Sequence, residues 1–386
     1  MSKIEAFRGL NNVVDPMRLD MAWLARADNI DITDTGAVRV RDGYTKSIDA
    51  EITGGYSTVD HQRAYVVQDN DLCALTSPTT TTALHTGLAT TRMHWAEINN
   101  QVFYNNGVDS GIILPDNTLL DWAWTKPSAP SVSAATGSLP AGQYQVRCTL
   151  TMADGRMTGA SAATVIDLTD DQALSISDLP AGANVYITPA NSTSFFLAVS
   201  NAPAALYWNF PPNALNRELA ADDLYPLPQG CGPIQFWNAR AFAAQSVGKD
   251  SVVWISQPFG FHLFDLAKDL IPIPGEVLML APHEQALVIG TDSAVYAYDG
   301  KGLKTIAEYG VIPGKAWAVD DSDADAPLYI WTQRGMCRFP EFANLTQEHV
   351  SVAPGVHTCA TVVQTDGQKR FVVNLHQGGS PFNKRL

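Results

Sequence analysis

The chain has 386 residues, of which 46% are hydrophobic and 17% charged, so it is large enough to bury more than one core. Its net charge of −14 argues against a surface that binds nucleic acid tightly, because that requires clustered lysines and arginines. The sequence has neither an early apolar run nor an apolar stretch of about 18 residues, so we expect a protein that is neither secreted nor membrane-spanning.

The N-terminal 44 residues carry two predicted elements. Residues 16–29 place Met17, Met21 and Leu24 at helical spacing, which predicts a short amphipathic helix. The segment 29–44 then predicts a β-hairpin with Gly36 at its turn. We expect this hairpin to pair with the C-terminal strand, which would leave no free sheet edge at the seam.

A second hairpin pattern recurs along the chain. In residues 286–300, apolar residues alternate through Leu287 and Ile289, a polar turn follows, and the alternation resumes at Val295. A single hairpin is marginal in water, so this unit needs neighbours. Related segments, some of them weak copies, surround six anchor positions: Tyr65, Phe103, Phe242, Leu287, Leu328 and Phe371.

The spacing of these anchors predicts the fold class. Successive anchors lie 38, 45, 41 and 43 residues apart, with one exception of 139 residues between Phe103 and Phe242. A period of about 40–45 residues in strand-rich units is typical of propeller blades, and the exception leaves about 97 residues for an inserted domain. We therefore predict an all-β protein with a β-propeller-like body of about six blades. A β-sandwich with irregular hairpins is the alternative.

The predicted insertion covers residues 127–210. A Pro/Ser linker opens it, Asp154-Gly155 predicts a hairpin turn before a strand at 158–165, and a Leu-Pro-Ala-Gly motif occurs twice, at 139–142 and 179–182. About seven short strands in 80 residues indicate an immunoglobulin- or fibronectin-like sandwich. The domains are thus 1–126 (N-terminal segment and first part of the body), 127–210 (sandwich) and 211–386 (second part of the body).

Three segments together resemble virion proteins of tailed bacteriophages. They are the opening GLNNVVDPMRLDMAWLARADNIDITDTGAVRVRDGY, the module SLPAGQYQVRCTLTMADGRMTGAS and the later ARAFAAQSVGKDSVVWISQPFGFHLFD, and the family they resemble is the tail nozzle or hub proteins of short-tailed phages. The resemblance implies a propeller-like body with inserted sandwich domains and six copies that form a tube below the portal and adaptor. It supplies no catalytic residues.

The sequence offers no convincing catalytic, cofactor or metal site, so we expect no enzyme, no cofactor and no metal. The acidic run 320–327 begins like a calcium loop, but Ala326 replaces the required Gly and Thr332 the required Glu, which favours a solvated loop. The histidines form no H-x-H or H-x-x-x-H pair. They are His61, His85, His94, His262, His283, His349, His357 and His376.

Cysteines and aromatic clusters complete the candidates. The five cysteines are scattered without a C-x-x-C pair, and we expect buried thiols: Cys73, Cys148, Cys231, Cys337 and Cys359. The aromatic segments 119–127 and 257–266 suit core filling, sugar platforms or interface anchors. Within the second segment, Phe259, Phe261 and Phe264 suit a contact between subunits.

Two classes of function follow from the sequence. The first is a structural tail component of the virion, a nozzle or hub made and assembled in the bacterial cytoplasm. It would form a cyclic homohexamer that extends the DNA exit channel. Its partners would be the portal or adaptor and the tail fibre or tip proteins. It would contact DNA only transiently and would not insert into a membrane. Its inner wall would be neutral to acidic, because basic side chains would hold the phosphates. The alternative is a propeller-plus-sandwich protein that binds or cleaves carbohydrate.

Overall fold

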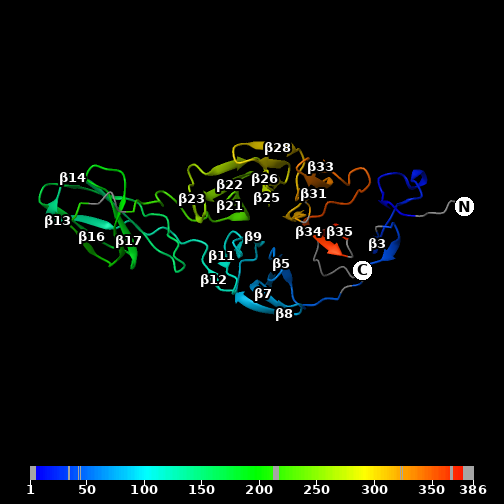
Figure 1. Cartoon of the computed structure of the whole chain (residues 1–386), viewed down its shortest axis with the longest axis horizontal. Coiled ribbons are helices and arrows are strands. Elements are labelled where there is room, and N and C mark those ends of the chain that lie inside the picture. The colour runs from blue at the N-terminus through cyan, green and yellow to red at the C-terminus, as the bar shows by residue number, and fades with distance from the viewer. Residues whose placement is uncertain are drawn as a thin grey trace.

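The computed structural model describes residues 6–33, 35–41, 43, 45–211, 217–321, 323, 325–365 and 368–376. Within these residues the chain is built of short β-strands, and its one helical element is the 3-10 turn η1 (Pro16–Arg18). Six small sheets surround a common centre, the inserted sandwich projects at one end, and the N-terminal segment lies at the other (Figure 1). The prediction of an all-β, propeller-like body with a sandwich insertion is confirmed.

The first two sheets of the body are four-stranded antiparallel meanders that pack against each other. Their shared core joins Tyr65 and Val67 of the first sheet to Val102, Tyr104 and Ile113 of the second. The strands are β5 (Ile52–Ser57), β6 (Ala64–Gln68), β7 (Asp71–Ser77) and β8 (Thr80–His85), then β9 (His94–Ile98), β10 (Gln101–Asn105), β11 (Ser110–Ile113) and β12 (Leu119–Leu120).

The third sheet follows the insertion and has five strands. A core around Phe103, Phe236 and Phe264 joins it to the second sheet, and a core around Phe242 and Leu287 joins it to the fourth. Its strands are β20 (Cys231–Trp237), β21 (Arg240–Val247), β22 (Asp250–Gln257), β23 (Gly260–Phe264) and β24 (Leu270–Ile273).

The fourth and fifth sheets repeat the four-stranded meander. Val288 of one and Ile330 of the other belong to a single buried cluster, so these sheets also pack face to face. The strands are β25 (Val277–Pro282), β26 (Leu287–Thr291), β27 (Val295–Tyr298) and β28 (Leu303–Ala307), then β30 (Trp317–Val319), β31 (Leu328–Thr332), β32 (Gly335–Phe339) and β33 (Ala343–Asn344).

The sixth sheet has three strands among the described residues: β29 (Gly314–Lys315), β34 (His357–Thr365) and β35 (Gln368–His376). β29 pairs with β34 in parallel, and β34 pairs with β35 in a long antiparallel hairpin. The rings of Tyr329 and Phe371, 5.7 Å apart, connect it to the fifth sheet.

The six anchors of the sequence repeat occupy related places. Five lie on the second strand of a blade and the sixth on β35: Tyr65 on β6, Phe103 on β10, Phe242 on β21, Leu287 on β26, Leu328 on β31 and Phe371 on β35. The predicted hairpin at 286–300 is confirmed as β26 and β27, with Leu287 opposite Tyr298. The repeat was visible because the second strands of four blades, β10, β21, β26 and β31, are buried on both faces between their neighbours.

The insertion is a sandwich of seven strands in two sheets, which lie within the predicted range 127–210. The turn at Gly155 has the positive φ of 86° that an Asp-Gly turn needs. The strand predicted at 158–165 begins only at Thr164, because Ala160 donates its N–H to the Ala221 carbonyl outside the sandwich. The strands are β13 (Ser131–Leu139), β16 (Gln172–Ser177) and β19 (Leu206–Trp208), facing β15 (Thr164–Leu168), β14 (Gly142–Thr149), β17 (Ala183–Ile187) and β18 (Phe196–Ala202).

Two N-terminal predictions are corrected. The helix predicted at 16–29 is a single 3-10 turn followed by an irregular stretch, because Met17 and Met21 are exposed and find no apolar surface to bury against. That stretch leads into β2 (Trp23–Leu24), which pairs in parallel with β1 (Gly9–Leu10). The hairpin exists as β3 (Ile30–Ile32) and β4 (Val38–Val40), but within the described residues its strands pair only with each other and not with β35.

Candidate assembly surfaces

Residues 6–41, here called the N-terminal arm, are attached to the body through a few polar contacts. Asn12 exchanges two hydrogen bonds with the Ser351 backbone, with its Nδ2 2.8 Å from the carbonyl and its Oδ1 2.7 Å from the amide. The Trp23 ring lies 4.6 Å from the ring of His349, and Asn11 Nδ2 lies 3.3 Å from His349 Nδ1. The loop after β33 therefore holds the arm in place.

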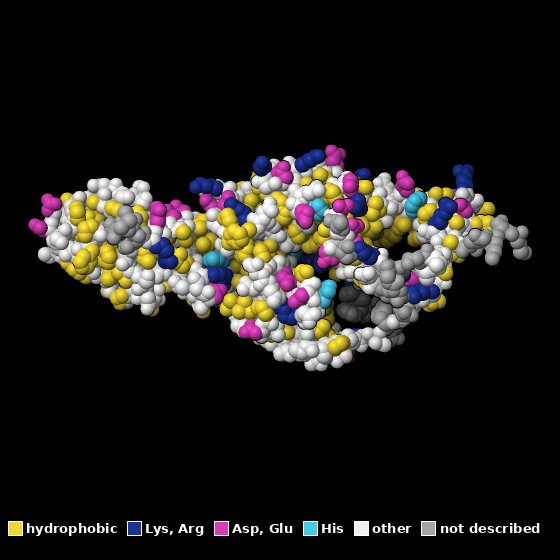
Figure 2. Space-filling model, viewed as in Figure 1, with side chains coloured by type: hydrophobic (Ala, Val, Ile, Leu, Met, Phe, Trp, Pro, Cys, Tyr) yellow, Lys and Arg dark blue, Asp and Glu magenta, His cyan; other side chains and the backbone are white. Residues whose placement is uncertain are grey.

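The arm exposes six large apolar side chains. Met17 is 91% exposed and Val40 73%, values far above those of residues that serve a core. Figure 2 shows hydrophobic side chains at this end of the molecule. Clustered exposed apolar residues mark an interaction surface. They are Val13, Val14, Met17, Met21, Val38 and Val40.

β35 is the last strand of its sheet. Within the described residues its backbone pairs only with β34, and the nearby hairpin reaches it through the ion pair between Asp31 and Arg370, 3.3 Å apart. Val363 and Val372 on this sheet are exposed. A long edge strand with exposed valines is a surface on which another strand can pair.

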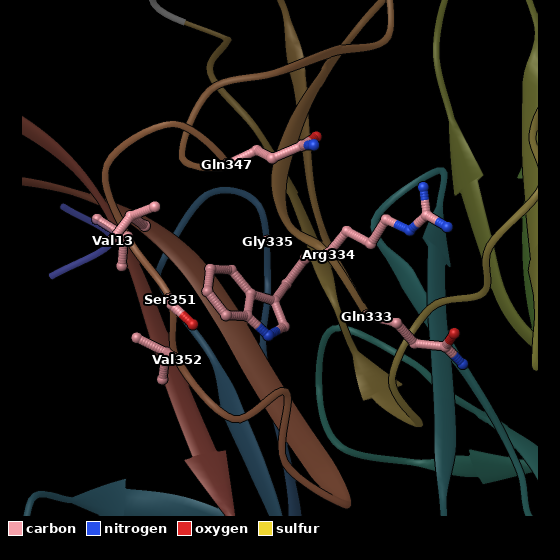
Figure 3. Close-up of a pocket in the computed structure, with 9 residues that line it drawn as sticks. Val13, Gln333, Arg334, Gly335, Gln347, Ser351 and Val352 are labelled. Carbon is pink, nitrogen blue, oxygen red and sulfur yellow. The ribbon is translucent and has the colours of Figure 1, made fainter. Parts of the chain in front are cut away.

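A pocket of about 310 Å³ lies between the arm and the fifth sheet. Val13 lies on one side, and Gln333, Arg334 and Gln347 line it from other segments (Figure 3). The Trp331 indole at its wall is 8% exposed and donates its N–H to the Pro354 carbonyl, so little of its ring faces the pocket.

The junction between sandwich and body, here called the neck, is tightly bonded. Arg156 pairs with Asp154 at 2.5 Å and donates to the carbonyls of Asp121 and Trp122 at the end of the second sheet. His262 Nε2 of the third sheet donates to the Met157 carbonyl at 2.9 Å. Burial lowers the pKa of His262, although the hydrogen bond to Met157 opposes this. The neck thus joins the sandwich to two blades.

A small core buries the rest of the neck. A side chain at Gly159 would place its Cβ 2.0 Å from the Leu224 carbonyl oxygen, so this approach requires glycine. The Lys126 ammonium lies 3.8 Å from the centre of the Tyr225 ring. The buried members of the cluster are Ala160, Tyr186, Phe195, Leu219, Ala221 and Leu224.

The predicted phenylalanine contact is corrected by the structure. Phe264 is fully buried and Phe261 packs partly into the core between the second and third sheets, so neither is available to a partner. Phe259 alone is exposed, at 80%, in a turn with φ of 57°. In the other aromatic segment Trp122 is buried and donates to the Phe261 carbonyl at 2.9 Å.

The described residues contain no group of three or more His, Cys, Asp or Glu side chains placed to hold a metal. In the acidic run 320–327, Asp320 is buried and pairs with Lys369 at 3.3 Å, and residues 322 and 324 lie outside the described part. His357 and His376, which are distant in sequence, are register partners whose rings lie 6.4 Å apart. Among the described residues no helix is long and apolar enough to span a membrane.

Four cysteines are buried free thiols, as predicted, but Cys359 is exposed. Its position on β34 explains the difference, because alternate residues of this strand face opposite sides and Cys359 lies on the open side. Burial raises the pKa of the Cys231 thiol to about 12. The sequence could not distinguish Cys359 from the other four.

No family model and no curated protein matches this chain. Solved structures similar to it include the extracellular domain of the putative hybrid two-component system BT4673 from B. thetaiotaomicron, at 10% identity and a TM-score of 0.31. That match covers 81% of this chain but only 36% of the other. PorZ of the Porphyromonas gingivalis type-IX secretion system matches at 15% identity and a TM-score of 0.25, over 91% of this chain and 54% of PorZ.

AztD from Citrobacter koseri, in its apo form, is 12% identical with a TM-score of 0.30, and the match covers 88% of this chain and 91% of AztD. This chain therefore spans less than two thirds of the first two proteins and most of the third. Similarity at this level carries no argument about what the protein does.

Proposed function

We infer that this protein is a structural component of a bacteriophage tail, a nozzle or hub subunit whose copies form a ring around the DNA exit channel. The observation that supports it most is the N-terminal arm, with Met17 at 91% exposure and Val40 at 73%. A subunit with a rigid, bonded sandwich at one end and an apolar, weakly attached arm at the other suits a head-to-tail contact between copies. Such contacts close into rings, whereas a two-fold contact stops at a dimer.

The remaining features of the proposal come from the resemblance and the charge. Six copies would form a tube that meets the portal or adaptor on one side and tail fibre or tip proteins on the other. With a net charge of −14, the wall facing the DNA would be neutral to acidic, so that phosphates slide past rather than bind. The protein would act in the virion without enzymatic turnover.

The oligomeric state tests this proposal. Native mass spectrometry and electron microscopy of the purified full-length chain should give a closed ring of six copies. An assembled ring whose lumen presents mostly lysine and arginine would contradict the conduit, and a chain that stays monomeric at micromolar concentration would contradict the ring.

The alternative, a carbohydrate-binding or glycan-cleaving protein, is supported by the pocket of about 310 Å³ with its amide and guanidinium groups. A glycan array with the intact protein distinguishes it from the tail component. Binding or turnover of a glycan that disappears in Arg334→Ala, with unfolding temperature unchanged, would favour the alternative. Absence of both is expected for the tail component.

A further inference from the structure

The innermost strands of the body meet around its axis. β9 of the second sheet contacts β20 of the third, β20 contacts β25 of the fourth, and the sixth sheet contacts β25 through β29 and β30 of the fifth sheet through β34. Figure 1 shows the sheets arranged around this centre. In propellers the innermost strands surround an axial channel, and the space between these strands is here called the axial channel.

Five polar side chains converge on this channel from two sides. Lys315 of β29 and Cys359 of β34 are register partners in a parallel pair, so their side chains share a face. His357 lies two residues before Cys359 on the same open face, while Thr358 and Ala360 between and beyond them are buried. His94 is the first residue of β9 and Arg92 lies two residues before it, within electrostatic range of both His357 and Cys359.

The two cations have no counter-charge. Within the described residues neither Arg92 nor Lys315 makes an ion pair or hydrogen bond, and Lys315 lies over the ring of Trp317, 5.4 Å from its centre. Solvent reaches both side chains, yet burial lowers the pKa of each, which describes groups in a wet channel surrounded by protein. An anion that bound between them would give both unpaired charges a partner.

The other groups in the channel are hydrogen-bond donors without charge. Burial and the nearby charge of Arg92 lower the pKa of His94 to about 3, so its imidazole is neutral at physiological pH. Burial, Arg92 and His376 likewise lower the pKa of His357. No carboxylate appears among the charges that act on Arg92, Lys315 or His94. Two cations with neutral N–H donors match an anion that has several oxygens and two charges.

We propose that the axial channel binds a phosphate-class oxyanion, held by Arg92 and Lys315 with His94 and His357 as neutral donors, beside the Cys359 thiol. This site is independent of the proposed tail function. The same chemistry could be supplied by the free ion or by the phosphoryl group of a larger molecule. Comparing inorganic phosphate with glucose 6-phosphate distinguishes these two sources.

Cys359 provides a built-in reporter, because the other four cysteines are buried. The experiment measures the alkylation rate of Cys359 in the full-length protein, by iodoacetamide and by anionic iodoacetate, in phosphate-free buffer of constant ionic strength. Added inorganic phosphate should slow both reactions in a saturable way. Protection by glucose 6-phosphate as well would identify the phosphoryl group as the ligand, and protection by inorganic phosphate alone would identify the free ion.

Arg92→Gln and Lys315→Gln should each weaken the apparent phosphate affinity about tenfold or more, since each removes a charged hydrogen bond. In both variants, any faster alkylation of Cys359 by anionic iodoacetate than by iodoacetamide should also be lost. The matched control is Lys249→Gln, which changes the net charge equally at an exposed turn outside the channel. It should leave protection unchanged.

Thermal unfolding shows that the variants fold. In phosphate-free buffer, Arg92→Gln should unfold at the wild-type temperature or above it, because the substitution removes an unpaired cation. Added phosphate should raise the unfolding temperature of the wild type but not that of Arg92→Gln. The proposal is overturned if phosphate fails to protect Cys359, if chloride at equal ionic strength protects as well, if Lys249→Gln weakens protection equally, or if Arg92→Gln unfolds at a lower temperature.

Discussion

The neck and the N-terminal arm join the two ends of the molecule to the body by different means. The neck combines the Arg156 contacts, the His262 hydrogen bond and a buried cluster that includes Phe195, which is 5% exposed. The arm has comparable polar contacts through Asn12 but leaves Met17 91% exposed. Polar contacts are therefore present in both regions, but the neck adds a fully buried apolar cluster, whereas the arm adds only the ring contact between Trp23 and His349.

We expect this difference to give the two regions different roles, with the neck contributing to the stability of the fold and the arm to assembly. Burial of apolar side chains supplies most of the free energy that fixes two parts of a chain, while a net hydrogen bond adds about 1 kcal/mol. The neck is thus expected to unfold with the body. The arm is expected to open locally without global unfolding, and it retains apolar surface for a neighbouring copy.

The largest expected effect comes from emptying the neck core. Phe195→Ala should lower the free energy of unfolding by about 3–5 kcal/mol, because it leaves a cavity in a fully packed cluster. Chemical denaturation followed by fluorescence measures this. A loss below about 1 kcal/mol would mean that the neck does not couple the sandwich to the body.

A smaller effect is expected from the attachment of the arm. Asn12→Ala removes both side-chain hydrogen bonds to Ser351. It should lower the free energy of local opening in residues 8–24 by about 1–3 kcal/mol, which is measured as faster hydrogen exchange there. The unfolding temperature of the body should not change. Arg18→Ala, in the same segment, is the control that should leave exchange unaltered; global destabilisation by Asn12→Ala would contradict the distinction between arm and neck.

The neck should also respond to acid through His262. Since burial lowers its pKa, the folded protein binds this proton less tightly than the unfolded chain, and stability is lost as pH falls below the ordinary histidine value of about 6.5. The unfolding temperature of the wild type should therefore fall more between pH 7.5 and pH 5 than that of His262→Gln, whose amide can still donate to Met157. Parallel curves would exclude His262 as a source of the acid sensitivity.

The smallest effect on stability is expected at the exposed end. Met17→Asp combined with Met21→Asp should change the free energy of unfolding by less than about 0.5 kcal/mol, because both side chains are exposed. The same variant should fail to assemble, as measured by native mass spectrometry. Exposed Val247→Asp, on the third sheet, is the control that should assemble normally.

The sequence predicted the body well because four blades bury their second strand on both faces, which leaves a visible apolar pattern around residues such as Leu287 and Leu328. The sandwich was visible through its turns, including Gly155. The N-terminal helix was wrong because spacing alone cannot show whether Met17 and Met21 have a surface to pack against.

The candidate surfaces were less accessible to prediction. Phe259, Phe261 and Phe264 looked alike in sequence, and only packing separates the exposed first residue from the buried last one. The axial cluster combines Arg92 with Lys315 and Cys359, more than 220 positions further along the chain, which no local pattern connects. Such convergence is a property of the arrangement of sheets that are far apart in sequence.

The central claim is that exposed apolar residues of the arm join copies of this chain into a ring. Electron microscopy of the purified wild-type protein beside the Met17→Asp, Met21→Asp variant tests it most directly. The account predicts closed six-membered rings for the wild type and folded single subunits for the variant. Wild-type protein that remains monomeric, or a variant that assembles as well as the wild type, would contradict it.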